Sequence, residues 1–177
     1  MKYAKIEKNS IANGPGIRVV LWCQGCSIHC KGCHNPETWD FNDGIEYESI
    51  DEKTILDELK KNYVDGITFS GGHPLEPQNI VRCKLLAERI KIDYPLKSIW
   101  LYTGLTLSEE DFFCLSTDEY FDYCKTKLLR LCDVVVDGPF IEEQRDISLP
   151  YCGSKNQRLI DVQKTLQNKK IEIWENN

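Results

Sequence analysis

Four of the nine cysteines in this 177-residue chain lie between positions 23 and 33. Cys26, Cys30 and Cys33 have the spacing C-x3-C-x2-C, and Gly25 and Gly32 lie beside them. Three thiolates this close can converge on one compact metal site, because a short loop closes at little entropic cost and glycine permits a tight backbone. Soft thiolates select zinc, copper(I) or iron–sulfur clusters. Structural zinc usually takes its ligands as two separated pairs, which a single short run fits poorly.

Cys23 extends the run to C-x2-C-x3-C-x2-C, so a closed four-thiolate site of the ferredoxin or zinc type is the alternative. Such a site would be a non-catalytic metal module. Against it, Cys23 continues an apolar run that we predict to be a strand, and the sheet would hold its side chain away from the loop. The other five cysteines show no C-x2-C pairing, and we expect each to be a small buried hydrophobic residue: Cys83, Cys114, Cys124, Cys132 and Cys152.

The elements that position this loop follow from the alternation of β-rich runs with longer helical stretches. This alternation favours an α/β fold with a largely parallel sheet. The predicted strands are Ile17–Trp22, taken as the first, then Gly66–Phe69, Ser98–Tyr102 and Val134–Asp137. Ligands collect beyond the carboxyl ends of parallel strands. These ends carry the cysteine loop, Ser70–Gly72, Thr103–Gly104 and Asp137–Gly138.

Three helices are predicted between these strands. The first begins at Ser49–Glu52, which has the spacing of a capping box. The second presents an apolar stripe that includes Val81 and stops at Pro95, because proline cannot continue a helix. The third begins at Ser108–Asp111 and contains Phe112, Phe113 and Leu115.

Composition narrows the class of protein. The chain has 41% hydrophobic residues and a net charge of −6, which is typical of one globular domain, here residues 1–177. No apolar run approaches the ~18 residues that cross a bilayer, and no secretory leader is recognisable, so we expect a cytoplasmic protein without membrane contact. The absence of a Lys/Arg cluster argues against nucleic acid as a partner.

Several ordered segments carry a family resemblance. They are Asn13–Arg18, Gln24–Cys26, Gly32–Trp39, Ser70–Gly72, Val136–Gly138 and Gly153–Arg158. The cysteine loop after a strand resembles the radical S-adenosylmethionine (SAM) enzymes. The ordered set more closely resembles the anaerobic ribonucleoside-triphosphate reductase-activating proteins, which are glycyl-radical activating enzymes. This resemblance implies a shortened, open (βα) partial barrel of the TIM type.

The resemblance also implies a chemistry for the three cysteines. Cys26, Cys30 and Cys33 would bind three irons of a [4Fe-4S] cluster and leave the fourth iron for SAM. Reductive cleavage of SAM would give methionine and a 5′-deoxyadenosyl radical, which takes a hydrogen atom from a glycine in the large catalytic subunit of the anaerobic reductase. A reduced flavodoxin or ferredoxin is the implied electron donor. The cofactors carry the difficult chemistry, and the protein binds and orients them.

The implied SAM-binding residues are Gly71, Gly72 and His73 around the methionine end and the backbone of Gly32, Cys33 and His34 around the adenine. Two of these depart from the family pattern. His73 stands where the family usually has an acid, and a neutral imidazole accepts through only one nitrogen. Three alternatives remain open: a ring nitrogen accepts from SAM, a water or a backbone carbonyl replaces the acid, or the affinity for SAM is lower. Gly32 stands where many radical SAM proteins have an aromatic residue, which leaves Tyr102 or Trp39 as further candidates for packing the adenine.

Other conspicuous residues have plainer interpretations. His29 is expected to be a solvated loop residue, and Arg18 a surface or ion-paired residue. Gly153–Arg158 is expected either to close the mouth of the barrel or to contact the partner. Two enzymatic alternatives remain: an activating enzyme of the pyruvate formate-lyase type, and a radical SAM enzyme that acts on a small molecule, such as a deazapurine synthase.

Overall fold

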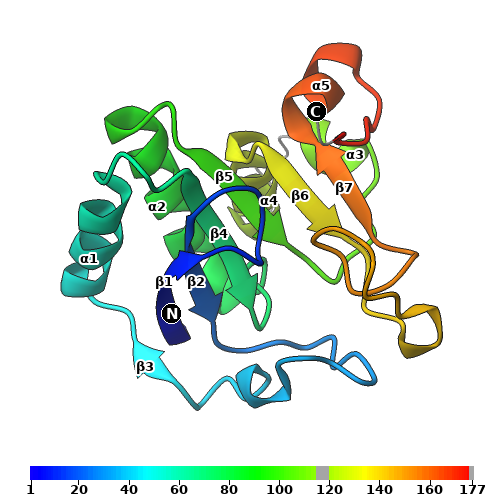
Figure 1. The fold of residues 1–177 in the computed structure, drawn as a ribbon, viewed down its shortest axis with the longest axis horizontal. Helices are drawn as coiled ribbons and strands as arrows, with labels where there is room; N and C mark the ends of the chain where they lie inside the picture. Colours follow the sequence, from blue (N-terminus) through cyan, green and yellow to red (C-terminus); the bar gives the residue numbers. More distant parts are fainter. Residues whose placement is uncertain (115–119, 176–177) are drawn as a thin grey trace.

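The computed structural model describes residues 1–114 and 120–175. Within these residues, seven strands form one sheet in the order β3-β1-β2-β4-β5-β6-β7 (Figure 1). The four central strands run parallel to one another: β2 (Arg18–Cys23), β4 (Gly66–Gly71), β5 (Ser98–Tyr102) and β6 (Val134–Asp137). The outer strands pair antiparallel: β1 (Lys2–Ser10), β3 (Ile45–Glu46) and β7 (Arg158–Asp161).

The four predicted strands are confirmed as the parallel centre of the sheet, with bounds that agree within two residues. The prediction that Ile17–Trp22 is the first strand is wrong, because β1 precedes it and pairs with β2. Strand β1 carries four charged residues, and much of it is exposed or half-buried. A strand with one solvent-exposed face lacks the continuous apolar run by which buried parallel strands are recognised.

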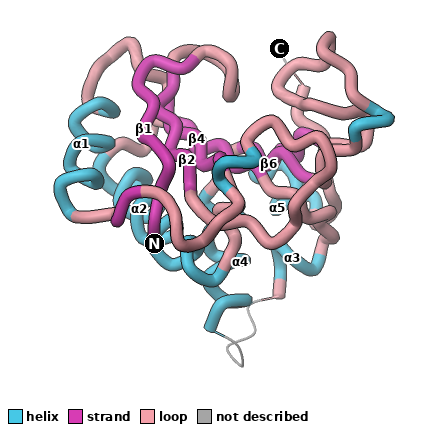
Figure 2. The backbone as a smooth tube through the Cα atoms, turned by 90° about the horizontal axis from the view of Figure 1, so that it is seen from below, coloured by secondary structure: helices cyan, strands magenta, loops and turns pink. Residues whose placement is uncertain are grey.

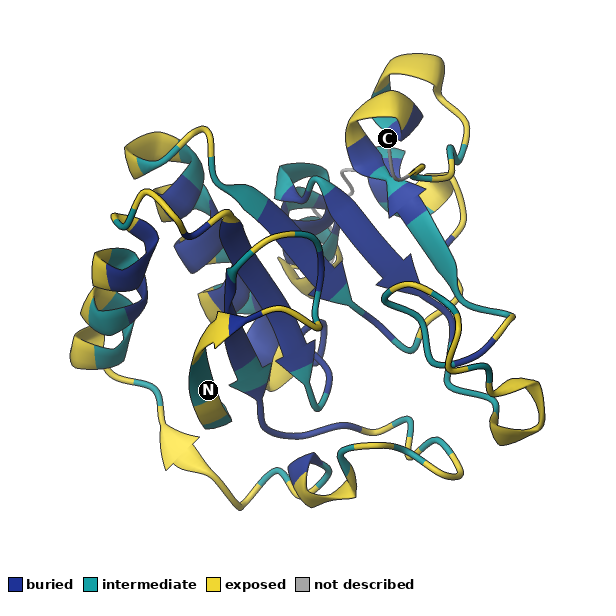
Figure 3. Ribbon diagram, in the orientation of Figure 1, coloured by how far each residue is buried: buried dark blue, intermediate teal, exposed yellow. Residues whose placement is uncertain are grey.

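The helices cover one face of this sheet. They are α1 (Ser49–Leu59), α2 (Pro77–Asp93), α3 (Glu110–Phe113), α4 (Tyr120–Leu131) and α5 (Val162–Asn168). Figure 2 shows α2 and α4 on one side of the strands, and Figure 3 shows the central strands buried while β3 is exposed. Among the described residues, none of the helices combines the length and apolar character needed to span a bilayer.

The helix predictions are confirmed in place and corrected in detail. Helix α2 ends at Asp93, ahead of Pro95, as predicted. The capping box of α1 is formed by Glu48 and Asp51, one residue before the predicted box at Ser49–Glu52. The helix begins after Glu48, which has an extended backbone. The predicted third helix is only the four residues of α3, and Leu115 lies outside the described residues. Helices α4 and α5 were not predicted.

Alternation along β2 separates the two faces of the sheet. Val19, Leu21 and Cys23 belong to the core under the helices. On the other face Arg18 is fully buried, and its guanidinium donates to the hydroxyls of Thr68 and Ser98, both at 2.8 Å. The expectation of a surface or ion-paired arginine is therefore wrong. Burial lowers the pKa of Arg18 to about 10, and hydroxyl and carbonyl oxygens satisfy the guanidinium.

Candidate functional site

A cavity of about 420 Å³ opens at the carboxyl ends of the parallel strands. The ends of all four parallel strands contribute to the wall of this cavity. The wall includes the cysteine loop after β2, Ser70–His73 at the end of β4, Tyr102–Gly104 at the end of β5, and Gly138 after β6. This is the edge at which a parallel sheet gathers ligands. The sequence-based placement of these four strand ends around one site is confirmed.

The three cysteines of the C-x3-C-x2-C motif all line this cavity. Cys26 is buried and Cys30 and Cys33 are half-buried, while the Cys33 amide donates to the Cys30 carbonyl at 3.1 Å. Burial raises the pKa of the Cys26 thiol, and backbone hydrogen bonds from Ile28 and His29 oppose this rise.

The three thiols supply the type of ligand that an iron–sulfur cluster takes. In a [4Fe-4S] cluster the thiolates bind different irons, so they surround a space instead of meeting at a point. Three thiols on the wall of one cavity meet that requirement.

Cys23 lies on the other side of the sheet from the cavity. Its side chain is fully buried in the core under the helices, and its Sγ is 3.7 Å from the Sγ of Cys83 on α2. A closed four-thiolate site would require this thiol to turn out of the core. The geometry therefore counts against the four-cysteine alternative.

The other cysteines follow the prediction only in part. Cys83, Cys124 and Cys132 are fully buried, as expected. Cys114 is exposed, and Cys152 is half-buried on the cavity wall, so both differ from the predicted buried hydrophobic residue. Cys114 follows α3, and Cys152 lies in the long loop before β7, so neither is held against the core by a helix or strand.

At Gly71 and Gly72, neighbouring backbone atoms of the chain itself leave no room for a side chain. A Cβ on Gly72 would lie 2.5 Å from the carbonyl oxygen of Gly25, and Gly71 has a φ of +96° with Cys23 backbone 2.7 Å from the position of a Cβ. The Gly72 amide donates to the Cys23 carbonyl at 2.8 Å, and the His73 amide donates to the Gly25 carbonyl at 2.9 Å. These glycines therefore let the end of β4 pack directly against the start of the cysteine loop, at the cavity wall.

His73 is buried and has a partner at each ring nitrogen. Nδ1 lies 3.2 Å from Glu76 Oε1, and Nε2 lies 2.8 Å from Thr103 Oγ1. Burial lowers the pKa of His73, although Glu76 opposes the shift. Burial by itself would raise the pKa of Glu76, but hydrogen bonds from Ser27 and His73 outweigh burial and lower it.

The remaining predicted residues are divided between the cavity and its surroundings. His34, Trp39 and Tyr102 line the cavity, whereas Gly32 is exposed and lies outside its wall. His29 is exposed, as expected, and its ring stacks on Trp39 with the centroids 4.6 Å apart.

The segment Gly153–Arg158 forms hydrogen bonds to the loop after β6. Gln157 accepts from the Gly153 amide at 2.8 Å and donates to the Gly138 carbonyl at 3.1 Å, and the Asn156 side chain donates to the Pro139 carbonyl at 2.7 Å. These bonds support the interpretation that this segment closes the mouth of the site.

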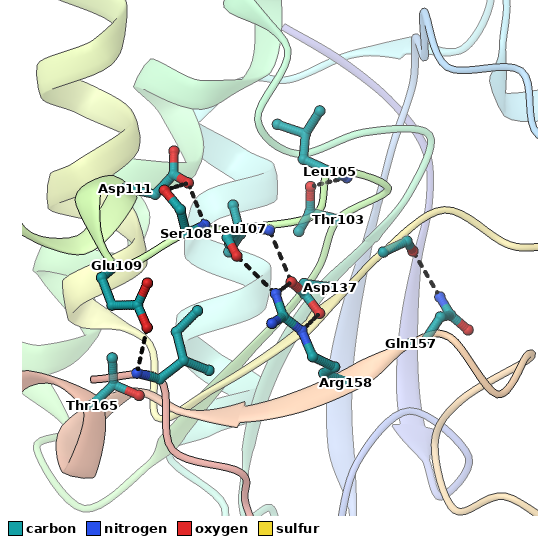
Figure 4. A network of polar contacts seen from close by, with 12 residues as sticks. Thr103, Leu105, Leu107, Ser108, Glu109, Asp111, Asp137, Gln157, Arg158 and Thr165 are labelled. Atoms are coloured by element: carbon teal, nitrogen blue, oxygen red, sulfur yellow. Dashed lines mark hydrogen bonds and ion pairs between the residues drawn. The ribbon is translucent and has the colours of Figure 1, made fainter.

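Figure 4 shows the ion pair beneath this mouth, in which Arg158 contacts the fully buried carboxylate of Asp137. Asp137 also accepts from the Leu107 amide at 2.9 Å, and Arg158 donates to the Leu107 carbonyl at 2.7 Å. The loop after β5 is thereby fixed to both β6 and β7.

Sequence reasoning missed Glu76, Thr103 as a side-chain partner, and Cys152. Glu76 precedes Pro77 at the start of α2, and its Oε1 accepts from the Ser27 amide at 2.8 Å and the Ser27 hydroxyl at 2.7 Å. A glutamate before a helix-starting proline indicates only an N-terminus. Its contact with the cysteine loop depends on how β2 and β4 pair, which no local pattern reveals.

Comparisons with known proteins agree with this geometry. Residues 12–160 match the family model described as a 4Fe-4S single cluster domain. The chain is 38% identical over 159 residues to an anaerobic ribonucleoside-triphosphate reductase-activating protein of Vibrio cholerae, with 89% of this chain and 96% of that protein covered. Proteins of the same name from Haemophilus influenzae and Enterobacteria phage T4 are 36% and 35% identical, covering 89% and 90% of this chain and 96% and 93% of their own. The chain belongs to the family of anaerobic ribonucleoside-triphosphate reductase-activating proteins.

Proposed function

We propose that this chain activates an anaerobic ribonucleotide reductase by generating a glycyl radical on its large catalytic subunit. The observation that carries the proposal is the placement of Cys26, Cys30 and Cys33 on one cavity wall beside Gly71 and Gly72, in a chain of this family. The names of the relatives favour this reductase over a pyruvate formate-lyase or a small molecule as the target.

The three cysteines would hold a [4Fe-4S] cluster, and they are the proposed catalytic and metal-binding residues. Gly71, Gly72 and the backbone of His73 would receive the methionine end of SAM, and the backbone of Cys33 and His34 would pack its adenine, while Gly32 lies outside the cavity wall. When bound, these cofactors supply reductive cleavage of SAM to a 5′-deoxyadenosyl radical. The chain's own task is to fix the loop, orient SAM and exclude water from the cavity.

The fold suits a protein substrate. We propose that the sheet is a shortened, open (βα) barrel within a single domain, residues 1–177, with helices on one face and the cavity at the carboxyl ends of its strands. An open barrel leaves room for a glycine-containing loop of the partner to enter. The proposed electron donor is a reduced flavodoxin or ferredoxin, and the proposed compartment is the cytoplasm, with no nucleic acid or membrane as a partner.

The test is formation of the glycyl radical itself. The protein, reconstituted with iron and sulfide under anaerobic conditions and reduced, is mixed with SAM and the purified large catalytic subunit, and the radical is measured by electron paramagnetic resonance. We expect a glycyl signal with wild-type protein and none with Cys30→Ala. A signal on pyruvate formate-lyase but not on the reductase would identify the alternative target, and no signal on either would contradict the proposal.

A further inference from the structure

His73 has no free acceptor for a ligand in this arrangement. The Thr103 hydroxyl oxygen accepts from the Leu105 amide at 3.1 Å, which leaves its own proton to donate to His73 Nε2 at 2.8 Å. On the other side, the Glu76 carboxylate can only accept, so Nδ1 carries the proton and donates to it. A neutral imidazole has one accepting nitrogen, and Thr103 occupies it.

The same bonds continue into the cysteine loop. Glu76 Oε1, which accepts from His73, also accepts from the amide and the hydroxyl of Ser27, the residue after Cys26. Hydrogen bonds to an ionised acceptor are the strong ones. One chain of bonds therefore joins Thr103 after β5, His73 after β4, Glu76 at the start of α2, and the first turn of the loop.

We propose that His73 is a positioning residue: as a neutral imidazole with its proton on Nδ1, it fixes the cysteine loop through Glu76. The ammonium of SAM is then bound by an acceptor other than the His73 side chain. This inference rests on the proposed function, because it assigns a role within the same site. An acid at position 73 would place a second carboxylate beside Glu76, and like charges at that distance disfavour ionisation of both.

The inference predicts an unexpected result for His73→Asp, the substitution that restores the family residue. If His73 were only a weak replacement for the acid, this variant would bind SAM more tightly. Under the present inference it loosens the loop instead, because Glu76 loses a donor and gains a repelling neighbour. Hydrogen–deuterium exchange of the peptide amides in residues 26–33 should rise about tenfold, the scale of one lost charge-assisted hydrogen bond.

The experiment uses the full chain, before and after addition of iron and sulfide, with exchange followed by mass spectrometry. His73→Asp/Glu76→Gln removes the second charge and should recover part of the protection. Glu88→Gln is the matched control, because it removes a carboxylate from the same helix at the pair with Lys84 and should leave exchange in the loop unchanged. Unchanged or slower loop exchange in His73→Asp, or a lower dissociation constant for SAM in its reconstituted form, would overturn the inference.

A second measurement needs no variant. In ¹⁵N-labelled wild-type protein, the ring nitrogens of His73 should report a protonated Nδ1 and a bare Nε2. A proton on Nε2 would overturn the inference even where every variant fails to fold. Failure of the proposed function is distinguishable, because it would show as wild-type protein that assembles no cluster while the tautomer and the loop exchange stay as described.

Discussion

The thiols of Cys23 and Cys83 lie 3.7 Å apart in the core, on the face of the sheet that is covered by helices. This contact explains why a fourth cysteine can precede the C-x3-C-x2-C motif without joining its site. It assigns Cys23 to packing between β2 and α2.

Cys23→Ala should therefore retain the cluster. We expect its iron content and visible spectrum after reconstitution to match the wild type, while the free energy of unfolding falls by about 1–2 kcal/mol for the small cavity left behind. Cys30→Ala is the counterpart and should lose the cluster with little change in stability. Loss of iron from Cys23→Ala would instead indicate a four-thiolate site.

Gly72→Ala should disturb the site without removing a ligand. Its Cβ would lie 2.5 Å from the backbone oxygen of Gly25, which cannot turn aside. We expect a loss of about 1–3 kcal/mol in the free energy of unfolding, the usual cost of overpacking, and reduced iron retention.

Gly104→Ala is a matched control for that variant, because its Cβ would meet only the Cδ1 end of Ile28, a side chain that can rotate. Iron retention in this control should stay near the wild-type level. Equal losses in the two variants would show that backbone contact at Gly72 has no special role.

Arg158→Ala should destabilise the mouth of the site. It leaves the fully buried carboxylate of Asp137 with the Leu107 amide but without its cation. Breaking a buried pair in this way costs about 3–5 kcal/mol, and the partial exposure of Arg158 favours the lower value.

Chemical denaturation measures this effect, and the double variant Arg158→Ala/Asp137→Ala completes the cycle. Since the double variant removes the stranded charge, it should be more stable than the sum of the two single losses predicts. Strict additivity would show that the two residues act independently.

Stability should fall as the solution becomes mildly acidic. Burial lowers the pKa of His73 below its ordinary value of 6.5. As the pH drops below that value, the unfolded chain takes up a proton that the folded chain does not. The free energy of unfolding then decreases by up to about 1.4 kcal/mol per pH unit, until the pH passes the folded pKa.

Denaturant titrations at several pH values between about 7.5 and 5.5 measure how the free energy of unfolding changes with pH around the ordinary histidine pKa. His73→Asn should flatten this dependence, because this variant removes the imidazole whose pKa is lowered by burial. An unchanged slope in His73→Asn would assign the dependence to other groups.

The sequence predicts the centre of the fold well and its margins poorly, for a physical reason. Val134–Val136 is buried on both faces, so it reads as a continuous apolar run, and the other parallel strands are also rich in buried apolar residues. Strand β1 has one solvent-exposed face, and charged residues interrupt its apolar ones. A mixed pattern of this kind does not separate a half-exposed element from a loop.

The candidate site was predictable as far as strand ends could place it. The rule for parallel sheets predicts that Cys26–Cys33 and Ser70–Gly72 lie at one site. The bonds from Glu76 to Ser27 and from His73 to Thr103 were not predictable, because they join residues that only the pairing of β2, β4 and β5 brings together. The resemblance implies that Gly72 contacts SAM, yet the group that lies closest to the position of its missing Cβ is the carbonyl oxygen of the chain's own Gly25.

The most direct test of the central claim is the cleavage of SAM by the isolated protein. After anaerobic reconstitution and reduction, SAM is added and 5′-deoxyadenosine is quantified for wild type, Cys23→Ala and Cys30→Ala. The account predicts product from wild type and from Cys23→Ala, and none from Cys30→Ala. A reducible cluster that yields no 5′-deoxyadenosine, with or without the reductase subunit present, would contradict it.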